Sequence, residues 1–438
     1  MNSRLELKKI IQRALDLKAE AIWVFIGQFG TALAGLIGIK LLTNVLSPSE
    51  FGKLALANTI IALIGTNFFG PFGQGFMRFW SISKDSGTLS IFYSVTDRFN
   101  KNIFLLSFIP SMILVFIVYG VEGMQWTVLV MFSLFTGIIT GLISLRASVF
   151  TAARQRRLTA LLNIGSTLAK PILAVLAVLC LWRTVNIALL GYITASLILF
   201  VIAERLYREN TFKKSNQDKD IDTSAFAKLN REILSYSWPF ILWGVFGWIH
   251  MSCDRWSLEA FFGSDVVGSF SVVSQLAIYP LIFGSGFFSI LFAPIAFQKA
   301  GDLSNPAAVK SANEVLLVMT VLFILVTILI ILIFKYYHQE LILLISNKHF
   351  TQYSQLLPGL TISWAFFYIG QLLTQFGLVR NIPRVYIVPK ILTASFAGIG
   401  TFYFASSKGP SGVVWGIGIA GFMYFCFCLL IALKINRK

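Results

Sequence analysis

Charged residues are scarce in this sequence. Only 13% of its 438 residues are charged, whereas 56% are hydrophobic, and the mean hydropathy is +0.77. A soluble globular protein has about 25% charged and about 45 to 50% apolar residues. The 41 Phe, 10 Trp and 13 Tyr are more than one aqueous core could bury without leaving large apolar patches outside. These proportions exclude a water-soluble fold and predict a protein that uses the bilayer as its solvent.

Cysteine is scarce too, and motifs of catalysis are missing. The four cysteines, Cys180, Cys253, Cys426 and Cys428, all lie inside apolar runs, which excludes a disulfide framework and a zinc site. The predicted extramembrane segments lack a nucleophile and base pattern, a Walker loop and an HExxH motif. We therefore expect a protein that is not an enzyme and that needs no cofactor or metal.

Long apolar runs fill most of the chain. A helix needs about 20 mostly apolar residues to cross a hydrocarbon core of ~30 Å, and this template predicts an all-α polytopic membrane protein with twelve transmembrane helices. The predicted spans are 21–46, 51–77, 98–120, 124–150, 158–182, 185–206, 238–262, 266–297, 313–335, 355–379, 384–405 and 411–434.

Polar segments divide the predicted spans into two halves. Residues 1–20 have mixed charge, with apolar residues spaced for one helical face, and lack the apolar core of a signal peptide. We expect them to form a retained cytoplasmic interfacial helix. A cytoplasmic connector at 207–237 separates an N-terminal six-helix bundle at 21–206 from a C-terminal six-helix bundle at 238–434, and 435–438 form a cytoplasmic tail.

The distribution of the net charge of +17 indicates the membrane topology. Most Lys and Arg residues fall in alternate segments that include the amino terminus, the connector and the carboxyl tail, whereas the segments on the other side hold Arg183, Lys335, Lys348 and Lys408. Because positive loops stay inside, both termini are expected in the cytoplasm. This distribution argues against a nucleic-acid partner.

An internal repeat relates the two halves. Residues 41–56 (LLTNVLSPSEFGKLAL) align without gaps on residues 257–272 (SLEAFFGSDVVGSFSV) at an offset of 216, with Gly52 and Gly268 identical. Duplications of this kind are typical of transporters. The repeat predicts two bundles related by a pseudo-two-fold axis along the membrane normal.

Glycine and proline cluster in the second span and in the corresponding eighth span. Proline removes an N–H group and kinks a helix, and glycine lets it bend. These residues are also common in membrane helices in general, but their recurrence in corresponding spans predicts a pair of bending helices around a cavity. The helix-bending candidates are Gly70, Pro71, Gly73, Gly75, Pro280, Gly284 and Gly286.

Five basic residues lie at least four residues from either end of a predicted span, and a Lys or Arg at the centre of a span costs about 2.5 to 3.5 kcal/mol. Lys170 is twelve residues from either end of its span, about 18 Å, too far to reach an interface, so we expect it to face an internal aqueous cavity. Lys40 and Arg255 occupy near-equivalent repeat positions, although Lys40 could instead reach the outer surface. Arg146 and Lys390 lie nearer the cytoplasmic side, which favours anchoring at the interface, with a cavity role as the alternative. Together the five predict a cationic cavity that binds substrate.

The seventh span contains ionisable residues at helical spacing. His250 and Asp254 form one i,i+4 pair, and Arg255 and Glu259 form another. Arg255 and Glu259 could simply neutralise each other, and a membrane His is often a packing residue. Because the charge of a histidine can change near neutral pH, His250, Asp254 and Glu259 are candidates for coupling to a proton or sodium ion.

The twelve-span organisation, the first repeat LLTNVLSPSEFGKLAL and the second repeat DRWSLEAFFGSDVVGSFSVVSQL resemble the polysaccharide or O-antigen (Wzx-type) flippases of the multidrug/oligosaccharidyl-lipid/polysaccharide exporter superfamily. The resemblance implies that an undecaprenyl-pyrophosphate-linked oligosaccharide, such as a lipopolysaccharide repeat unit, moves from the inner to the outer leaflet of a bacterial inner membrane by alternating access. Implied partners are that glycan, membrane lipids, the coupling ion and polysaccharide polymerase machinery.

Two other classes of function remain open. A cation-coupled drug or organic-cation exporter of the same superfamily would need membrane carboxylates, and Asp254 and Glu259 are the clear candidates. A membrane-embedded glycan polymerase or ligase would need a large outer loop, and the longest, at 335–354, is modest. The basic residues within spans favour the flippase over both.

Overall fold

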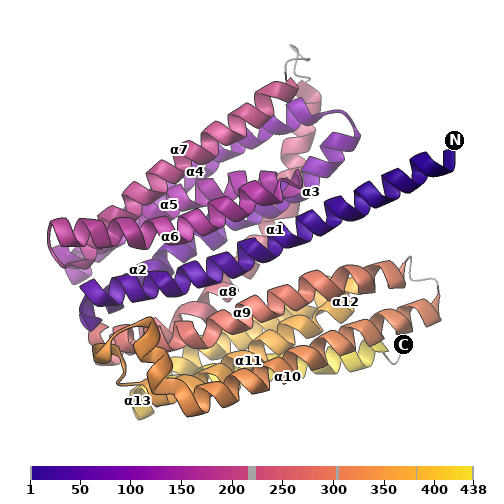
Figure 1. The fold of residues 1–438 in the computed structure, drawn as a ribbon. Helices are drawn as coiled ribbons and strands as arrows, with labels where there is room; N and C mark the ends of the chain where they lie inside the picture. The colour runs from indigo at the N-terminus through magenta and orange to yellow at the C-terminus, as the bar shows by residue number, and fades with distance from the viewer. Residues whose placement is uncertain (1, 216–222, 302–304, 381, 437–438) are drawn as a thin grey trace. The chain divides into compact units, whose positions relative to one another are not determined.

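The computed structural model describes residues 2–215, 223–301, 305–380 and 382–436, and every element in these ranges is helical (Figure 1). The all-α prediction is confirmed. The elements are α1 (Asn2–Val45), α2 (Pro48–Ile64), a π-helix η1 (Gly65–Phe69), α3 (Gly70–Asp85), α4 (Leu89–Glu122), α5 (Met124–Ala152), α6 (Arg156–Cys180), α7 (Val185–Ser215), α8 (Thr223–Phe262), α9 (Ser264–Ala300), α10 (Pro306–Ile345), the 3-10 helices η2 (Lys348–Phe350) and η3 (Ser354–Leu356), α11 (Leu357–Leu373), α12 (Gln375–Val379), the 3-10 helix η4 (Pro383–Tyr386) and α13 (Ile387–Asn436).

Ten helical stretches in the described chain are long and apolar enough to cross a membrane. They are Ile22–Val45, Pro48–Asp85, Leu89–Glu122, Met124–Ala152, Arg156–Cys180, Val185–Glu209, Ser264–Ala300, Pro306–Ile345, Ser354–Val379 and Pro383–Ile435.

Two elements account for the difference between these ten stretches and the twelve predicted spans. Helix α8 contains the predicted seventh span but is not among the ten, because tryptophan and charged residues dilute its apolar run. Helix α13 contains the last two predicted spans and is interrupted at Gly409, whose φ of +63° favours glycine. The count of twelve crossings stays a prediction.

The first helix has no break where the sequence predicts one. A single helix α1 runs from Asn2 to Val45, across the expected boundary between the interfacial segment at 1–20 and the first span. Helical propensity continues through Leu, Lys, Ala and Glu residues at this boundary, and no glycine or proline stops it there.

The helices cluster into two compact units. The first unit comprises Met1–Gly38, Ile60–Ala177 and Asn186–Leu242, and the second comprises Ile39–Thr59, Val178–Val185 and Trp243–Lys438. In the first, α5 packs against both α3 and α4, and in the second α9, α10 and α11 pack against one another and α11 also packs against α13. The predicted bundle limits at 21–206 and 238–434 stay a prediction, since the second unit also takes in the short segments 39–59 and 178–185.

Helices α2 and α9 touch at their backbones inside the second unit. A Cβ atom on Gly52 would lie 1.8 Å from the carbonyl oxygen of Ser264, and one on Gly268 would lie 1.9 Å from that of Pro48. Only glycine permits such an approach. Both pairs of residues, Gly52 with Gly268 and Pro48 with Ser264, are 216 positions apart, so the contact is reciprocal.

The second predicted span is interrupted next to its glycine and proline cluster. The π-helix η1 lies between α2 and α3, and Pro71 sits in the first turn of α3, where its missing N–H is tolerated. Gly73 and Gly75 are buried packing positions, because added Cβ atoms would lie 2.6 Å from Ser148 Oγ and 2.5 Å from Ser237 Oγ.

The corresponding helix in the second repeat behaves differently. Helix α9 continues through Pro280 and Pro294 with no described residue of non-helical backbone conformation inside it. Gly284 packs against the ring of Phe323, 3.1 Å from where its Cβ would lie. The two copies therefore share composition but differ in backbone: one contains a π-helix and the other is continuous.

Candidate functional site

The second unit contains a cavity of about 540 Å³, within the range of about 300 to 1,000 Å³ typical of small-molecule sites. Helices α8, α9, α11, α12, η4 and α13 surround it. Its described lining consists of aromatic, amide, hydroxyl and aliphatic side chains with one charged residue, Lys390. The lining residues are Trp243, Gly247, Met251, Ser285, Gly286, Ser289, Phe367, Tyr368, Gln371, Leu372, Thr374, Gln375, Leu378, Pro383, Tyr386 and Lys390.

Lys390 is held by an aromatic ring and not by a carboxylate. Its Nζ lies 4.1 Å from the ring centroid of Trp243, a cation–π distance. Within the described part of the chain, this Nζ has no hydrogen bond and no ion pair. The ammonium therefore lies over the Trp243 ring at the cavity, without a carboxylate partner in the described chain. Lys390 and Gly286 are the two predicted site residues that line this cavity.

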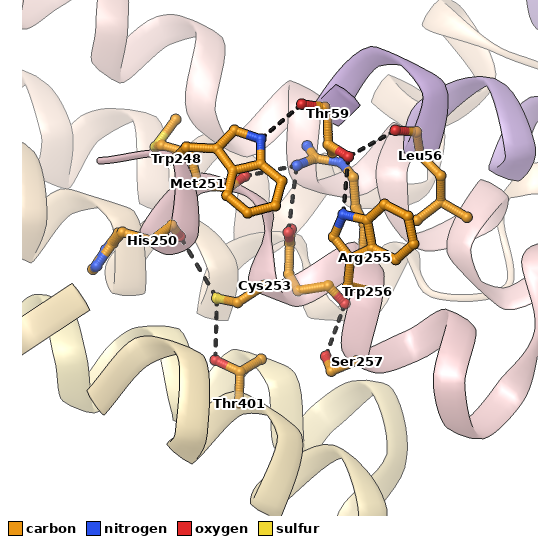
Figure 2. A network of polar contacts seen from close by, with 11 residues as sticks. Leu56, Thr59, Trp248, His250, Met251, Cys253, Arg255, Trp256, Ser257 and Thr401 are labelled. Atoms are coloured by element: carbon orange, nitrogen blue, oxygen red, sulfur yellow. Dashed lines mark hydrogen bonds and ion pairs between the residues drawn. The ribbon is translucent and has the colours of Figure 1, made fainter. Parts of the chain in front are cut away.

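His250 belongs to an aromatic cluster. It is 3% exposed, and its ring stacks on Phe367 at 4.6 Å and meets Trp364 edge-on at 5.6 Å. Its Nε2 has no hydrogen-bond partner among the described residues. Figure 2 shows the imidazole pointing away from the polar contacts around Cys253 and Arg255, so the structure gives His250 a packing environment.

Asp254 and Arg255, adjacent in sequence, form an ion pair on α8. Arg255 Nη1 lies 3.3 Å from Asp254 Oδ1 and donates to the carbonyl oxygen of Met251 at 2.8 Å. Asp254 is 1% exposed, and its Oδ2 has no hydrogen-bond partner in the described chain. Glu259 accepts a hydrogen bond from Ser264 Oγ at 2.8 Å.

Two tryptophans of α8 hold α2 through one threonine (Figure 2). Trp248 Nε1 donates to the carbonyl oxygen of Thr59 at 2.7 Å, and Trp256 Nε1 donates to Thr59 Oγ1 at 2.9 Å. On the other side of α8, Cys253 Sγ lies 3.5 Å from Thr401 Oγ1 of α13. These bonds fix the helix that carries Asp254 and Arg255, since buried polar groups that keep their partners resist rearrangement.

Arg146, in the first unit, is neutralised by two carboxylates. Its guanidinium is 2.9 Å from Asp97 Oδ1 and 2.9 Å from Glu204 Oε2, and it lies 3.6 Å from the ring centroid of Tyr207. Arg208 also pairs with Glu204, at 2.8 Å. Arg146 thereby ties α5 to α4 and α7, and carboxylates already balance its charge.

Lys170, in the same unit, differs from Arg146 because it has no described carboxylate partner. It lies in α6 directly before Pro171, is partly buried, and has no hydrogen bond or ion pair within the described ranges. Helix α1 packs closely at this level, since a Cβ on Gly38 would lie 3.0 Å from Pro171 Cγ. The ammonium of Lys170 therefore remains available to an anion or water.

Lys40 caps a helix in the second unit. Its Nζ donates to the carbonyl oxygens of Leu343, at 3.1 Å, and Ser346, at the C-terminal end of α10. A cation there satisfies free carbonyls and complements the helix dipole. Lys40 therefore has a structural role, because its ammonium already donates hydrogen bonds to two backbone carbonyls.

The sequence alone did not predict the carboxylate partners of Arg146 or the glutamines that line the cavity. Asp97 and Glu204 lie at span ends, where acidic residues are unremarkable, and only packing shows that they meet Arg146. Gln371 and Gln375 could have been recognised in the sequence, because they are two amides four residues apart within the predicted span 355–379.

The helical fold and its ten stretches that are long and apolar enough to cross a membrane define a multi-pass membrane protein. The chain belongs to the polysaccharide biosynthesis protein family, whose model matches residues 17–299. No curated protein sequence matches it.

Solved structures with the same fold are transporters and a flippase. The lipid II flippase MurJ in an inward closed conformation superimposes with a TM-score of 0.65 at 14% identity, over 96% of this chain and 90% of that one. The MATE transporter VcmN of Vibrio cholerae gives 0.60 at 15% identity, over 96% and 98%. A MOP superfamily transporter from Pyrococcus furiosus gives 0.62 at 14% identity, over 97% and 96%. This chain thus has the fold of MOP superfamily transporters.

Proposed function

We propose that this protein is a flippase that moves an undecaprenyl-pyrophosphate-linked oligosaccharide, such as an O-antigen repeat unit, from the inner to the outer leaflet. Family membership and the shared fold with a lipid II flippase support this class of substrate. The observation that carries the proposal is Lys170, a lysine within a membrane-spanning helix that has no partner in the described structure.

An unpaired ammonium inside a membrane protein is costly, so its presence requires water or an anion nearby. A pyrophosphate carries about two negative charges and is the charged part of the substrate. Lysine provides a point charge on a flexible stem, whereas arginine favours rigid bidentate capture. Lys170 therefore suits a headgroup that must bind on one side and leave on the other.

The proposed cycle is alternating access in a bacterial inner membrane, with twelve crossings and both termini in the cytoplasm. The reciprocal contact of Gly52 and Gly268 supports a pseudo-two-fold relation between the two repeats. The π-helix beside Gly70 and Pro71 supports bending of the second span. Membrane lipids and polysaccharide polymerase machinery are the expected surroundings and partners.

The test is a substitution series at Lys170 in bacteria whose own surface-glycan flippase is deleted. Lys170→Arg should retain partial function, Lys170→Ala should lose most of it and Lys170→Glu should abolish it, at equal membrane abundance. Surface polysaccharide is measured by gel and immunoblot. Lys348→Glu, at an exposed lysine of η2, is the matched control and should behave as wild type. Wild-type polysaccharide with Lys170→Glu would overturn the proposal.

A cation-coupled drug exporter is the second candidate, and Asp254 favours it. Its Oδ2 is buried without a described partner, as a carboxylate that exchanges a proton or sodium ion would be. Coupling through His250, Asp254 and Glu259 fits a flippase as well. In proteoliposomes, Asp254→Asn should abolish dependence on the pH or sodium gradient. Ethidium efflux by the wild type without glycan transport would favour the exporter.

A further inference from the structure

The cavity of the second unit contains polar groups that no protein atom satisfies. The side-chain amides of Gln371 and Gln375 and the Nζ of Lys390 line it, and none of the three has a hydrogen bond or ion pair in the described part of the chain. Lys40, by contrast, is satisfied by two backbone carbonyls. Unsatisfied groups at a cavity wall are available to a ligand.

The combination of groups specifies the chemistry of that ligand. Glutamine amides both donate and accept hydrogen bonds, as sugar hydroxyls require. The rings of Trp243, Phe367 and Tyr368 provide apolar walls against which the C–H face of a sugar ring can pack. The single ammonium of Lys390, with no acidic residue among the described lining, adds one positive charge.

We propose that this cavity is a subsite for one sugar of the transported glycan, a sugar that bears a single anionic group, and that Lys390 binds the anion while Gln371 and Gln375 bind the hydroxyls. The inference rests on the proposed function for the origin of the sugar. It adds a second cation to Lys170: one for the pyrophosphate, and Lys390 for a carboxylate or phosphate on the sugar itself.

The experiment measures binding without transport. Full-length protein in nanodiscs is titrated with methyl glucuronide, methyl glucoside, glucose 1-phosphate and inorganic pyrophosphate, and binding is followed by saturation-transfer NMR and tryptophan fluorescence. Wild type should bind the glucuronide or the sugar phosphate about tenfold more tightly than the neutral glucoside, because a charge-assisted hydrogen bond adds to the neutral ones. The preferred anion distinguishes a carboxylated from a phosphorylated sugar.

Substitutions locate the site. Lys390→Met should remove the preference for the anionic sugar, Lys390→Arg should keep it, and Gln371→Leu should weaken the glucoside and the anionic sugars alike. Trp243→Phe should remove the fluorescence change, which separates this tryptophan from the other nine. Lys348→Met, at an exposed lysine of η2, is the matched control and should bind the sugars as wild type does.

Three results would overturn the inference: equal affinity for the anionic and neutral sugars, an anionic preference that survives Lys390→Met, or tighter binding of pyrophosphate at Lys390, which would assign the cavity to the lipid headgroup. Lys390→Arg shows that loss of binding in Lys390→Met is not misfolding. Because no transport is involved, failure here leaves the Lys170 transport result intact. Wild-type transport by Lys170→Glu would likewise leave the binding result intact.

Discussion

Among the basic residues well inside the predicted spans, each unit has an arginine paired with a carboxylate and a lysine without a described carboxylate partner. In the first unit these are Arg146, between Asp97 and Glu204, and Lys170. In the second unit they are Arg255, beside Asp254, and Lys390. The two lysines lie in corresponding predicted spans, the fifth and the eleventh.

The comparison separates two uses of positive charge within a membrane. The arginines make several directed bonds at once, as a planar guanidinium can, and Arg146 uses them to join three helices. The lysines leave their charge without a carboxylate, one with no described contact and one on a tryptophan ring. Depth in a span therefore does not determine the role of a basic residue; its partners do.

The largest expected effect is loss of stability on removing Arg146. Arg146→Leu would leave the half-exposed Asp97 without its counter-charge and the partly buried Glu204 paired with Arg208 alone. We expect a loss of about 3 kcal/mol, at the low end for a broken buried pair because Asp97 stays hydrated. Thermal unfolding in detergent, read by fluorescence-detected size exclusion, measures it.

Lys170→Leu is the matched control for this change. It removes a basic residue from the same unit but breaks no described ion pair, so we expect no loss of thermal stability. A loss as large as that of Arg146→Leu would show that Lys170 has a structural partner, and the comparison between paired and unpaired cations would fail.

The sequence predicts the helices well because apolar length alone decides them. It does not predict the π-helix at Gly65–Phe69, which depends on how Gly141 and Phe69 pack, nor the uninterrupted α1. Among the site residues, depth identified Lys170 as unusual, whereas it placed Lys390 with Arg146 near the cytoplasmic side. It could not show that Lys40 reaches the end of α10, since that bond joins segments about three hundred residues apart.

The second expected effect concerns Arg255. Arg255→Leu leaves Asp254, 1% exposed, without its guanidinium, and we expect a loss of about 2 kcal/mol, the scale of a hydrogen bond to a charged group. Adding Asp254→Asn to Arg255→Leu should restore part of the loss, since an amide needs no counter-charge. If the double variant is no more stable than Arg255→Leu, the pair does not balance charge in this unit.

The third effect is smaller because it concerns a helix end. Lys40→Met removes the hydrogen bonds to Leu343 and Ser346 and the cation at the end of α10, and we expect a loss of about 1 kcal/mol. Lys348→Met, at an exposed position, should change stability by less than about 0.5 kcal/mol. Equal losses of stability for the two variants would show that Lys40 has no structural role.

The smallest expected effect is on Lys390, and it is the sharpest test of the comparison. Lys390→Met removes a cation–π contact with Trp243, worth about 0.5 to 2 kcal/mol, but it also removes a charge that has no carboxylate to balance it. The two effects oppose each other, so thermal stability without ligand should change by less than about 0.5 kcal/mol. Methyl glucuronide should then raise the unfolding temperature of the wild type and not of Lys390→Met, because a ligand stabilises only the protein that binds it. A large loss of stability without ligand would place Lys390 with the structural arginines and would separate it from Lys170.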